Sequence, residues 1–457
     1  MGAFAVNRIF FDSKNIRNSV GYARENTMIE IEEENSRKAR ALLIAPPAKK
    51  GSDGIPRELQ GLVKTLGMEI ADTLVLPRLE VTPSYGLGTG KASEIAAHAK
   101  NLDADCIIFD FEIDPTKQRN WEKLSGVPCF DRQEVILRIF DSRARTKEAS
   151  LQVELAKLQY SLPRLAHSYG DMARQRGGSY GAKGSGETQL ELDRRQVETK
   201  IDQVKRDLAK VVRERETQRK RRDRLAEPSC ALVGYTNAGK SSLLNALTDA
   251  GVLAEDKLFA TLDPTTRKLP VKNGRDILIT DTVGFISNLP HNLVNAFKST
   301  LEEAIHADLL LLVIDASDEN AEMQYDTVLH VLDEIGAGAN EKLVILNKMD
   351  KVSADDSLFL RLDQKFPSAV KISTKNAETL TPLIETLVER LSSGVEEYIV
   401  PMSEQGLISL VRQSGFIIEE NWLEDGVHLK ARISRGSNSG QKAIALLSKY
   451  KKTGDTQ

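Results

Sequence analysis

The sequence has few of the residues that build disulfide or metal frameworks. It contains three cysteines, Cys106, Cys129 and Cys230, and none of them forms a CxxC pair. The sequence therefore indicates no disulfide framework and no metal framework, which suits a reducing cytosol. No signal-peptide pattern is present, so we expect a cytoplasmic protein.

Long hydrophobic runs are also missing. The longest is Leu309–Ile314, far shorter than the roughly 20 apolar residues that a membrane-spanning helix needs. Val6 stands where a myristoylation signal requires Ser or Thr. We therefore expect no transmembrane segment and at most a peripheral association with membranes.

The chain has little net charge: 63 Lys and Arg against 66 Asp and Glu give −3. Global charge therefore predicts no nucleic-acid partner, and the lack of an aromatic stacking motif argues against base-specific reading. Residues 194–224 differ, with 13 Lys or Arg against 6 Asp or Glu, densest at Arg219–Arg222. This excess indicates either a solvated helix face or a surface that binds a polyanion.

A length of 457 residues suggests about three or four domains. We expect an N-terminal α/β domain over 1–142. Its expected strands are 41–45, 70–76 and 106–110, and its expected helices are 58–66 and 92–102. Alternating strands and helices predict a largely parallel sheet. Residues 1–40 are poorly patterned.

Two leucine- and valine-rich series predict a helical hairpin over 143–226. The first series is Leu151, Leu155, Leu158, Leu162 and Leu165, and the second is Leu190, Val197, Ile201, Val204, Leu208 and Val211. Both have heptad spacing, which favours an antiparallel two-helix hairpin or ordinary core-facing helices of one bundle. Pro163 should kink or end the first helix.

A glycine-rich segment, 174–189, separates the two series. It carries Arg174, Arg176 and Lys183 and has almost no apolar side chain to bury. We expect it to project from the hairpin. It is either a flexible connector or a basic finger, Gly177–Gly186, that orders against RNA phosphate.

The most informative motif is Gly234-Tyr-Thr-Asn-Ala-Gly-Lys-Ser241, which has the GxxxxGKS pattern of a phosphate-binding loop. It follows the apolar run Cys230–Val233 and opens into a helix-like stretch. Backbone amides and the helix N-terminus can cradle phosphates. Lys240 can reach the terminal phosphates, and the Ser241 hydroxyl can hold Mg²⁺.

Two further motifs follow apolar strands. Asp281-Thr-Val-Gly284 places a carboxylate where it can hold Mg²⁺ through water and a glycine amide where it can sense a γ-phosphate. Asn347-Lys-Met-Asp350 identifies the base, because Asp350 can accept hydrogen bonds from the N1–H and 2-amino groups of guanine, which adenine lacks. Asn347 should tie the base-binding loop to the phosphate loop, and the stem of Lys348 should cover the purine.

Two weaker elements complete the site. Ser373-Thr-Lys375 should close over the base through backbone amides. Among Thr261, Thr265 and Thr266, we expect Thr261 to supply the second hydroxyl to Mg²⁺ and to contact the γ-phosphate, in a segment ordered by triphosphate.

The G domain is expected over 227–393, with strands at 231–235, 277–281, 309–315, 343–347 and 370–373. A small α+β domain, 394–457, should follow, with a helix at 407–413 and a hairpin of 416–420 and 427–433. The fold class is therefore α/β. It comprises a P-loop G domain with a mixed, mostly parallel sheet and helices on both faces, a small α/β N-terminal domain with a two-helix coiled hairpin, and a small α+β C-terminal domain.

These motifs resemble those of the translation-factor-related GTPases, and the flanking sequence resembles the HflX family. The matching segments are 184–195, 234–241, 258–267, 281–286, Leu289-Pro-His and 296–304, and the resemblance covers roughly 40–435. It also favours Thr261 as the Mg²⁺ threonine. Thr374 departs from the family, where Ala is more usual.

The resemblance implies a GTPase that uses Mg²⁺, binds the large ribosomal subunit and its RNA, and separates or recycles stalled ribosomes. The hairpin would sit on ribosomal RNA, with the glycine loop near the peptidyl transferase centre. We expect a monomer that binds no DNA. Phe285 stands where Ras-like enzymes carry a water-orienting glutamine, so intrinsic hydrolysis should be slow and stimulated by the ribosome.

The expected catalytic residues are Lys240, Thr261 and Gly284, and the expected metal ligands are Ser241 and Thr261. The expected nucleotide-binding residues are Gly234, Tyr235, Thr236, Asn237, Ala238, Gly239, Lys240, Ser241, Ser242, Phe259, Ala260, Thr261, Leu262, Asp263, Asp281, Thr282, Val283, Gly284, Asn347, Lys348, Met349, Asp350, Ser373, Thr374 and Lys375.

Two other functions remain open from the residues. One is a GTP-dependent signalling switch whose hairpin binds a protein effector. The other is an NTP-driven RNA remodeller that acts through the N-terminal domain. For the remodeller, Tyr85-Gly-Leu-Gly-Thr-Gly-Lys91 resembles a phosphate loop, but Tyr85 and Ala92 occupy the positions of the first glycine and the Ser/Thr. We interpret this segment as a turn before a helix.

Overall fold

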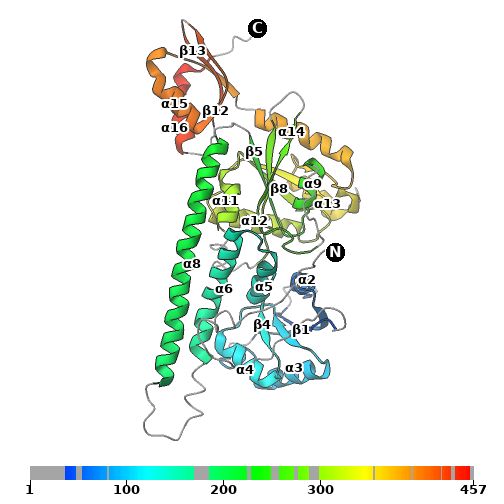
Figure 1. Ribbon diagram of the computed structural model, residues 1–457. Coiled ribbons are helices and arrows are strands. Elements are labelled where there is room, and N and C mark those ends of the chain that lie inside the picture. Colours follow the sequence, from blue (N-terminus) through cyan, green and yellow to red (C-terminus); the bar gives the residue numbers. More distant parts are fainter. Residues whose placement is uncertain are drawn as a thin grey trace, which may run out of the picture. The chain divides into compact units, whose positions relative to one another are not determined.

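The computed structural model (Figure 1) describes residues 37–47, 54–79, 82–168, 185–223, 228–248, 257–271, 276–287, 298–353, 356–392, 395–423, 425–433 and 438–452. The chain forms two compact units. Unit 1 contains the described residues up to Lys210 together with Lys257–Phe259. Unit 2 contains the described residues from Val211 onward, apart from those three. The four-domain division expected from the sequence stays a prediction.

Unit 1 is built on a four-stranded sheet of order β2-β1-β3-β4. Its strands are β1 (Arg40–Ala45), β2 (Glu69–Val75), β3 (Cys106–Phe109) and β4 (Cys129–Asp131). All neighbouring pairs are parallel, which confirms the predicted parallel sheet. Strand β1 has an almost entirely apolar sequence and β3 is buried along its whole length, as expected for strands covered on both faces.

Helices alternate with these strands along the chain. They are α2 (Arg57–Thr65), α3 (Thr89–Asn101), α4 (Pro115–Ser125) and α5 (Arg132–Arg143). Trp121 of α4 is fully buried between the sheet and α3, and its indole N–H donates to the Tyr85 carbonyl oxygen at 2.9 Å. This bond holds residues 85–88 as a turn that leads into α3. The prediction of a turn before a helix is therefore confirmed.

The expected hairpin is formed by α6 (Lys147–Ser168) and α8 (Ser185–Asp223), which lie side by side in Figure 1. Apolar residues from both predicted series pack together in unit 1, among them Leu155, Leu158, Val197, Ile201 and Val204. The structure thus confirms the hairpin.

We expected Pro163 to kink or end the first helix; the helix does not end there, because α6 continues to Ser168, and the kink stays a prediction. The neighbouring Arg164 side chain is tied both to this helix and to other elements of unit 1. Its guanidinium donates to the carbonyl oxygens of Tyr160 and Ile113 and to the Asp131 carboxylate. These bonds hold the turn around the proline in place, although proline itself donates no backbone hydrogen bond.

The glycine-rich segment lies mostly outside the described residues, including Arg174, Arg176 and Lys183. Helix α8 begins at Ser185, so the end of the predicted finger is helical. Arg219–Arg222 lie in α8, but their side chains are outside the described part. No helix in the described ranges is both long enough and apolar enough to cross a membrane.

Unit 2 contains a six-stranded sheet of order β10-β9-β8-β5-β7-β6. Its strands are β5 (Ser229–Gly234), β6 (Thr265–Leu269), β7 (Ile277–Asp281), β8 (Leu309–Asp315), β9 (Lys342–Asn347) and β10 (Val370–Lys371). All pairs are parallel except β6 with β7. The predicted mixed, mostly parallel sheet is confirmed. Strand β6 was not predicted.

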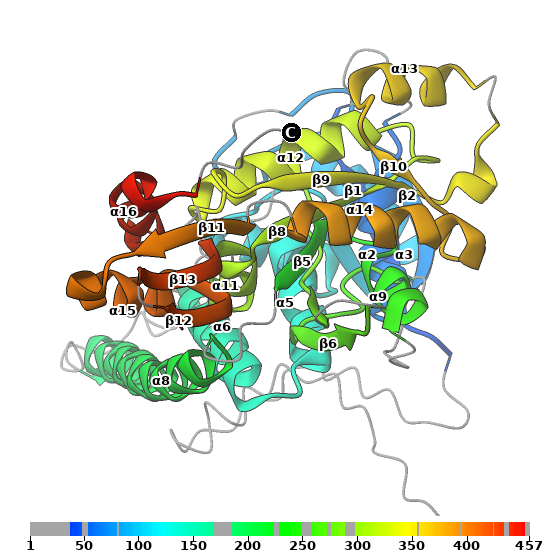
Figure 2. The same ribbon diagram turned by 90° about the horizontal axis from the view of Figure 1, so that it is seen from above.

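Helices cover both faces of this sheet. They are α9 (Lys240–Thr248), α11 (Lys298–His306), α12 (Ala321–Glu334), α13 (Ser357–Lys365) and α14 (Thr381–Ser392), with short 3₁₀ turns at Met349–Lys351 and Ala377–Leu380. Leucines of α9 and α14 pack on one face. Helices α12 and α13 belong to a second apolar cluster. Figure 2 shows α12 and α14 on opposite sides of β9.

The end of unit 2 is an antiparallel sheet of order β11-β13-β12 that packs against two helices. Its elements are β11 (Val395–Val400), α15 (Gln405–Ser414), β12 (Gly415–Leu423), β13 (Gly426–Ile433) and α16 (Asn438–Leu447), with 3₁₀ turns at Met402–Glu404 and Ser448–Tyr450. The predicted helix and hairpin are present, whereas β11 and α16 were not predicted.

Candidate nucleotide site

The sequence motifs meet at one edge of the unit 2 sheet. The phosphate loop joins β5 to α9, Asp281–Gly284 follows β7, and Asn347–Asp350 follows β9. The three strands are parallel, so their carboxyl ends lie at the same edge, which is where ligands bind in open α/β sheets. The predicted phosphate, metal and base elements are thus brought together.

The phosphate loop is tied directly to the base-binding motif. The Asn347 side-chain amide donates to the Ala238 carbonyl oxygen at 2.9 Å, as predicted. Gly239 has φ +95, and a Cβ added there would lie 2.3 Å from Asn347 Nδ2. Only glycine suits this position, because a side chain would be strained and would break the tie.

Lys240 is buried within the phosphate loop. Its ammonium donates to the carbonyl oxygens of Gly234 at 3.1 Å and Tyr235 at 2.8 Å. Burial lowers the pKa of Lys240 to about 8, and the nearby Asp281 carboxylate only partly opposes this shift. A phosphate group would favour the charged form and raise this pKa again.

Three oxygen-bearing side chains converge beside Lys240. Ser241 Oγ donates to Asp281 Oδ2 at 2.6 Å, Thr261 Oγ1 donates to the same oxygen at 2.9 Å, and the two hydroxyls are 2.8 Å apart. Asp281 is fully buried, and burial raises its pKa although Lys240 and the two hydroxyls act against it.

This group of oxygens fits a magnesium ion. Asp281 Oδ1 has no hydrogen-bond partner within the described part of the chain. Buried polar atoms are normally paired, so an unpaired carboxylate oxygen in a group with two hydroxyls suits a bound cation. Mg²⁺ prefers oxygen ligands and commonly binds through one or two carboxylates, phosphates and water.

The position of the other threonines supports Thr261. Thr265 and Thr266 lie in β6, where Thr266 Oγ1 shares a 2.9 Å hydrogen bond with Thr280 Oγ1. Phe259, which we expect to bind nucleotide, belongs to unit 1, and its role stays a prediction. It is 2% exposed, has φ +55, and packs edge-to-face on Phe140 with 4.6 Å between ring centroids.

The Asp281–Gly284 segment packs tightly on the phosphate loop. Thr282 Oγ1 donates to the Leu232 carbonyl oxygen at 2.7 Å, so it anchors the segment to β5. A Cβ on Gly284 would lie 2.8 Å from Thr236 Cα. Phe285 is 2% exposed and offers no polar side-chain atom, so it cannot orient a water molecule.

The base-binding motif is held by its own neighbours. Asp350 accepts hydrogen bonds from Ser373 Oγ at 2.8 Å and Lys375 Nζ at 3.0 Å. These two bonds, that of Lys375 foremost, lower the pKa of Asp350 and keep it ionised. Lys348 adopts a left-handed conformation, φ 62, and its ammonium lies 2.7 Å from Asp315 Oδ2.

Sequence reasoning missed two residues that shape this motif. Asp315, which pairs with Lys348, ends the apolar strand β8, and that position was a usable signal. Thr379 accepts from the Ser373 amide and donates to the Ser373 carbonyl oxygen, both at 3.0 Å. No pattern in the sequence indicates Thr379.

The remaining predicted residues lie in these same segments and differ in how exposed they are. Leu262 and Val283 are buried, Ser242, Ala260, Asp263, Met349 and Thr374 are half-buried, and Asn237 is exposed with φ 62. The Met349 amide donates to the Ile372 carbonyl oxygen at 3.2 Å. This bond joins the base-binding motif to the loop that carries Ser373.

Comparison with protein families gives three consecutive matches. Residues 56–141 match a family described as the N-terminal region of GTP-binding GTPases, and residues 143–222 match its middle region. Residues 229–348 match a family described as 50S ribosome-binding GTPases. The phosphate loop and the two motifs after β7 and β9 begin within this last match, so the site belongs to a P-loop GTPase.

Individual relatives match over most of their length. GTPase HflX of Akkermansia muciniphila is 44% identical over 88% of this chain and 96% of its own, and that of Escherichia coli K12 is 40% identical over 82% and 89%. A crystal structure of a GTP-binding protein from Sulfolobus solfataricus with GDP is 26% identical over 78% of this chain and 99% of its own, at a TM-score of 0.40. The identities and coverage of the two bacterial relatives show that the chain belongs to the HflX family of GTPases.

Proposed function

We propose that this GTPase binds the large ribosomal subunit and uses GTP binding and hydrolysis to split or recycle stalled ribosomes. The observation that carries the proposal is the match of residues 229–348 to 50S ribosome-binding GTPases within a chain of the HflX family. We further propose that it acts as a monomer in the cytoplasm.

The predicted site residues take separate roles in this proposal. The phosphate loop and Lys240 bind the phosphates, Gly284 contacts the γ-phosphate through its amide, and Asp350 selects guanine. Ser241 and Thr261 would hold Mg²⁺, with Asp281 beside them. When bound, this ion neutralises charge on the phosphoryl oxygens. Thr261 would contact the γ-phosphate only when triphosphate is bound, so its segment acts as the switch.

Slow intrinsic hydrolysis follows from the residue after Gly284. The apolar Phe285 is buried against the phosphate loop and cannot orient water. A group supplied by a partner, or a rearranged switch, could raise the rate by about 10³–10⁵. We propose that the ribosomal large subunit supplies this stimulation.

The helical hairpin is the proposed RNA-binding element. Several of its basic residues are already paired with acidic neighbours, such as Arg194 with Glu198 at 2.9 Å and Lys210 with Asp207 at 2.9 Å. The Arg219–Arg222 stretch contributes four of the positive charges within residues 194–224. Phosphate binding by this stretch predicts affinity that falls steeply with salt.

Co-sedimentation with ribosomal subunits tests the proposal. Reversing the four charges of Arg219–Arg222 should abolish binding to large subunits, and nuclease treatment should have the same effect. A matched control reverses four exposed lysines on unit 1 helices and should leave binding intact. These lysines are Lys64, Lys91, Lys100 and Lys123. Unchanged binding by the Arg219–Arg222 variant would show that the docking surface is misassigned, and binding that survives nuclease would favour a protein effector.

A further inference from the structure

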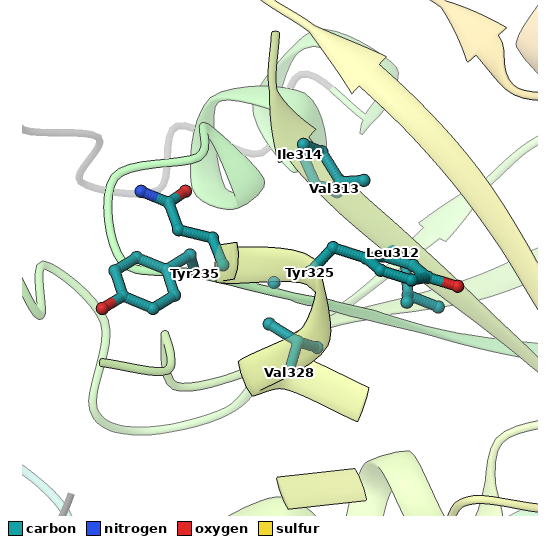
Figure 3. A pocket seen from close by; sticks show the side chains of 8 residues that line it. Tyr235, Leu312, Val313, Ile314, Tyr325 and Val328 are labelled. Atoms are coloured by element: carbon teal, nitrogen blue, oxygen red, sulfur yellow. The ribbon is translucent and has the colours of Figure 1, made fainter. Parts of the chain in front are cut away.

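Tyr235 occupies a position that the phosphate-loop pattern leaves open to any residue. Its side chain is 7% exposed. Figure 3 shows it at a small pocket between β5, β8 and α12, with Tyr325 of α12 on the same lining. The two rings extend in opposite directions, so their hydroxyls lie at opposite ends of this group of side chains.

The Tyr235 hydroxyl reaches the segment that follows Gly284. It accepts a hydrogen bond from the Ser287 amide at 2.6 Å. Two backbone bonds join the same two segments: the Phe285 amide donates to the Gly234 carbonyl oxygen at 3.1 Å, and the Thr236 amide donates to the Phe285 carbonyl oxygen at 2.7 Å. We call these three bonds the clasp.

The clasp fixes the position of Gly284 relative to Lys240. A Cβ on Gly284 would lie 2.8 Å from Thr236 Cα and 3.0 Å from Lys240 Nζ. The Gly284 backbone, whose amide would contact the γ-phosphate, therefore already lies close to the Lys240 ammonium that would bind it. A site arranged in advance binds its ligand without a further ordering cost.

We propose that Tyr235 is a positioning residue for triphosphate recognition, acting through Gly284. The backbone bonds of the clasp require no particular side chain, whereas the bond to Ser287 requires the tyrosine hydroxyl. This hydroxyl is the part of the clasp that the sequence specifies. The inference rests on the GTPase activity and does not depend on the ribosomal role.

Under this proposal, Tyr235 should affect the binding of GTP but not that of GDP. The α- and β-phosphates are held by the phosphate loop and Lys240, and the base by Asp350, and none of these contacts uses the Ser287 amide. Only the γ-phosphate contact depends on where Gly284 lies. Weakening the clasp should therefore affect triphosphate binding and turnover but leave diphosphate binding unchanged.

The test is the Tyr235→Phe variant of the full chain, which removes one oxygen and keeps the ring. Affinities for fluorescent GDP and for a fluorescent non-hydrolysable GTP analogue are measured by equilibrium titration. We expect the analogue affinity to fall about three- to tenfold, the range for one neutral hydrogen bond. GDP affinity should stay within about twofold, and kcat should fall alongside the analogue affinity.

Tyr325→Phe is the matched control, because it removes the hydroxyl oxygen from another tyrosine that lines the same pocket. The Tyr325 ring packs on Phe366. This control variant should change neither affinity. Equal losses for GDP and the analogue in Tyr235→Phe would show a merely structural role and overturn the proposal, as would unchanged affinities for both. A thermal unfolding midpoint for each variant separates local from global effects. Retained guanine binding in every case would leave the GTPase assignment standing.

Discussion

Replacing Asp350 with Asn should change the base that the protein prefers from guanine to xanthine. The carboxylate offers two acceptor oxygens, and guanine presents two donors, N1–H and the 2-amino group. An amide offers one acceptor and one donor. Xanthine keeps N1–H and carries a carbonyl in place of the amino group, so it matches the amide while guanine does not.

The structure indicates the size of the effect. Asp350 is held ionised by Ser373 and Lys375, so its bonds to guanine would be charge-assisted and worth about 1.5–3 kcal/mol each. The substitution removes one such bond and sets the amide donor against the 2-amino donor. A loss of about 2–3 kcal/mol corresponds to a roughly 30- to 150-fold weaker affinity for guanine nucleotides, GDP included.

Equilibrium titration with fluorescent GDP and xanthosine diphosphate measures this change. Asp363→Asn is a matched control, since Asp363 pairs with Lys371 at 2.6 Å away from the base-binding motif. It should keep the guanine preference. An Asp350→Asn protein that still prefers guanine over xanthine would refute the assignment of Asp350 to the base.

Other predictions concern the phosphate side. Thr261→Ala should lower GTP turnover at least about tenfold, or about 1.4 kcal/mol, whereas Thr266→Ala should not; equal losses in a steady-state assay would contradict the assignment. Gly239→Ala should weaken GDP binding by about tenfold or more, because the added Cβ meets Asn347; unchanged calorimetric affinity would contradict this. The pKa of Lys240 is lowered to about 8, and its side chain binds phosphate when charged. Nucleotide affinity should therefore fall as pH rises through 8, and binding near this pH should take up a proton. Calorimetry in buffers of different ionisation enthalpy detects the proton uptake, and a nucleotide affinity that does not change from pH 7 to 9 would refute the prediction.

Much of the site could be predicted because its residues follow apolar strands at recognisable spacing. The phosphate loop after β5, the Asp281 motif after β7 and the Asp350 motif after β9 each combine a buried run with a fixed pattern. Parallel strand ends then bring these motifs together. The same reasoning predicted the heptad packing of α6 on α8.

The missed features depend on contacts that are distant in sequence. Strand β6 is an edge strand with two exposed positions and one buried one, so it carries no strong apolar signal. Phe259 packs on Phe140, which lies far away along the chain. Helix α6 passes through Pro163, and the adjacent Arg164 side chain bonds to Asp131 and Ile113, which are distant in sequence. No local pattern contains these partners.

The measurement that tests the central claim most directly is sucrose-gradient sedimentation of purified ribosomes mixed with this protein. With GTP or a non-hydrolysable analogue, the peak of intact ribosomes should decline in favour of separate subunits, with the protein on the large one. With GDP, or with the Thr261→Ala protein, intact ribosomes should persist. If GTP-bound protein leaves the ribosome profile unchanged under conditions where it still binds guanine nucleotide, the proposed role in splitting ribosomes is contradicted.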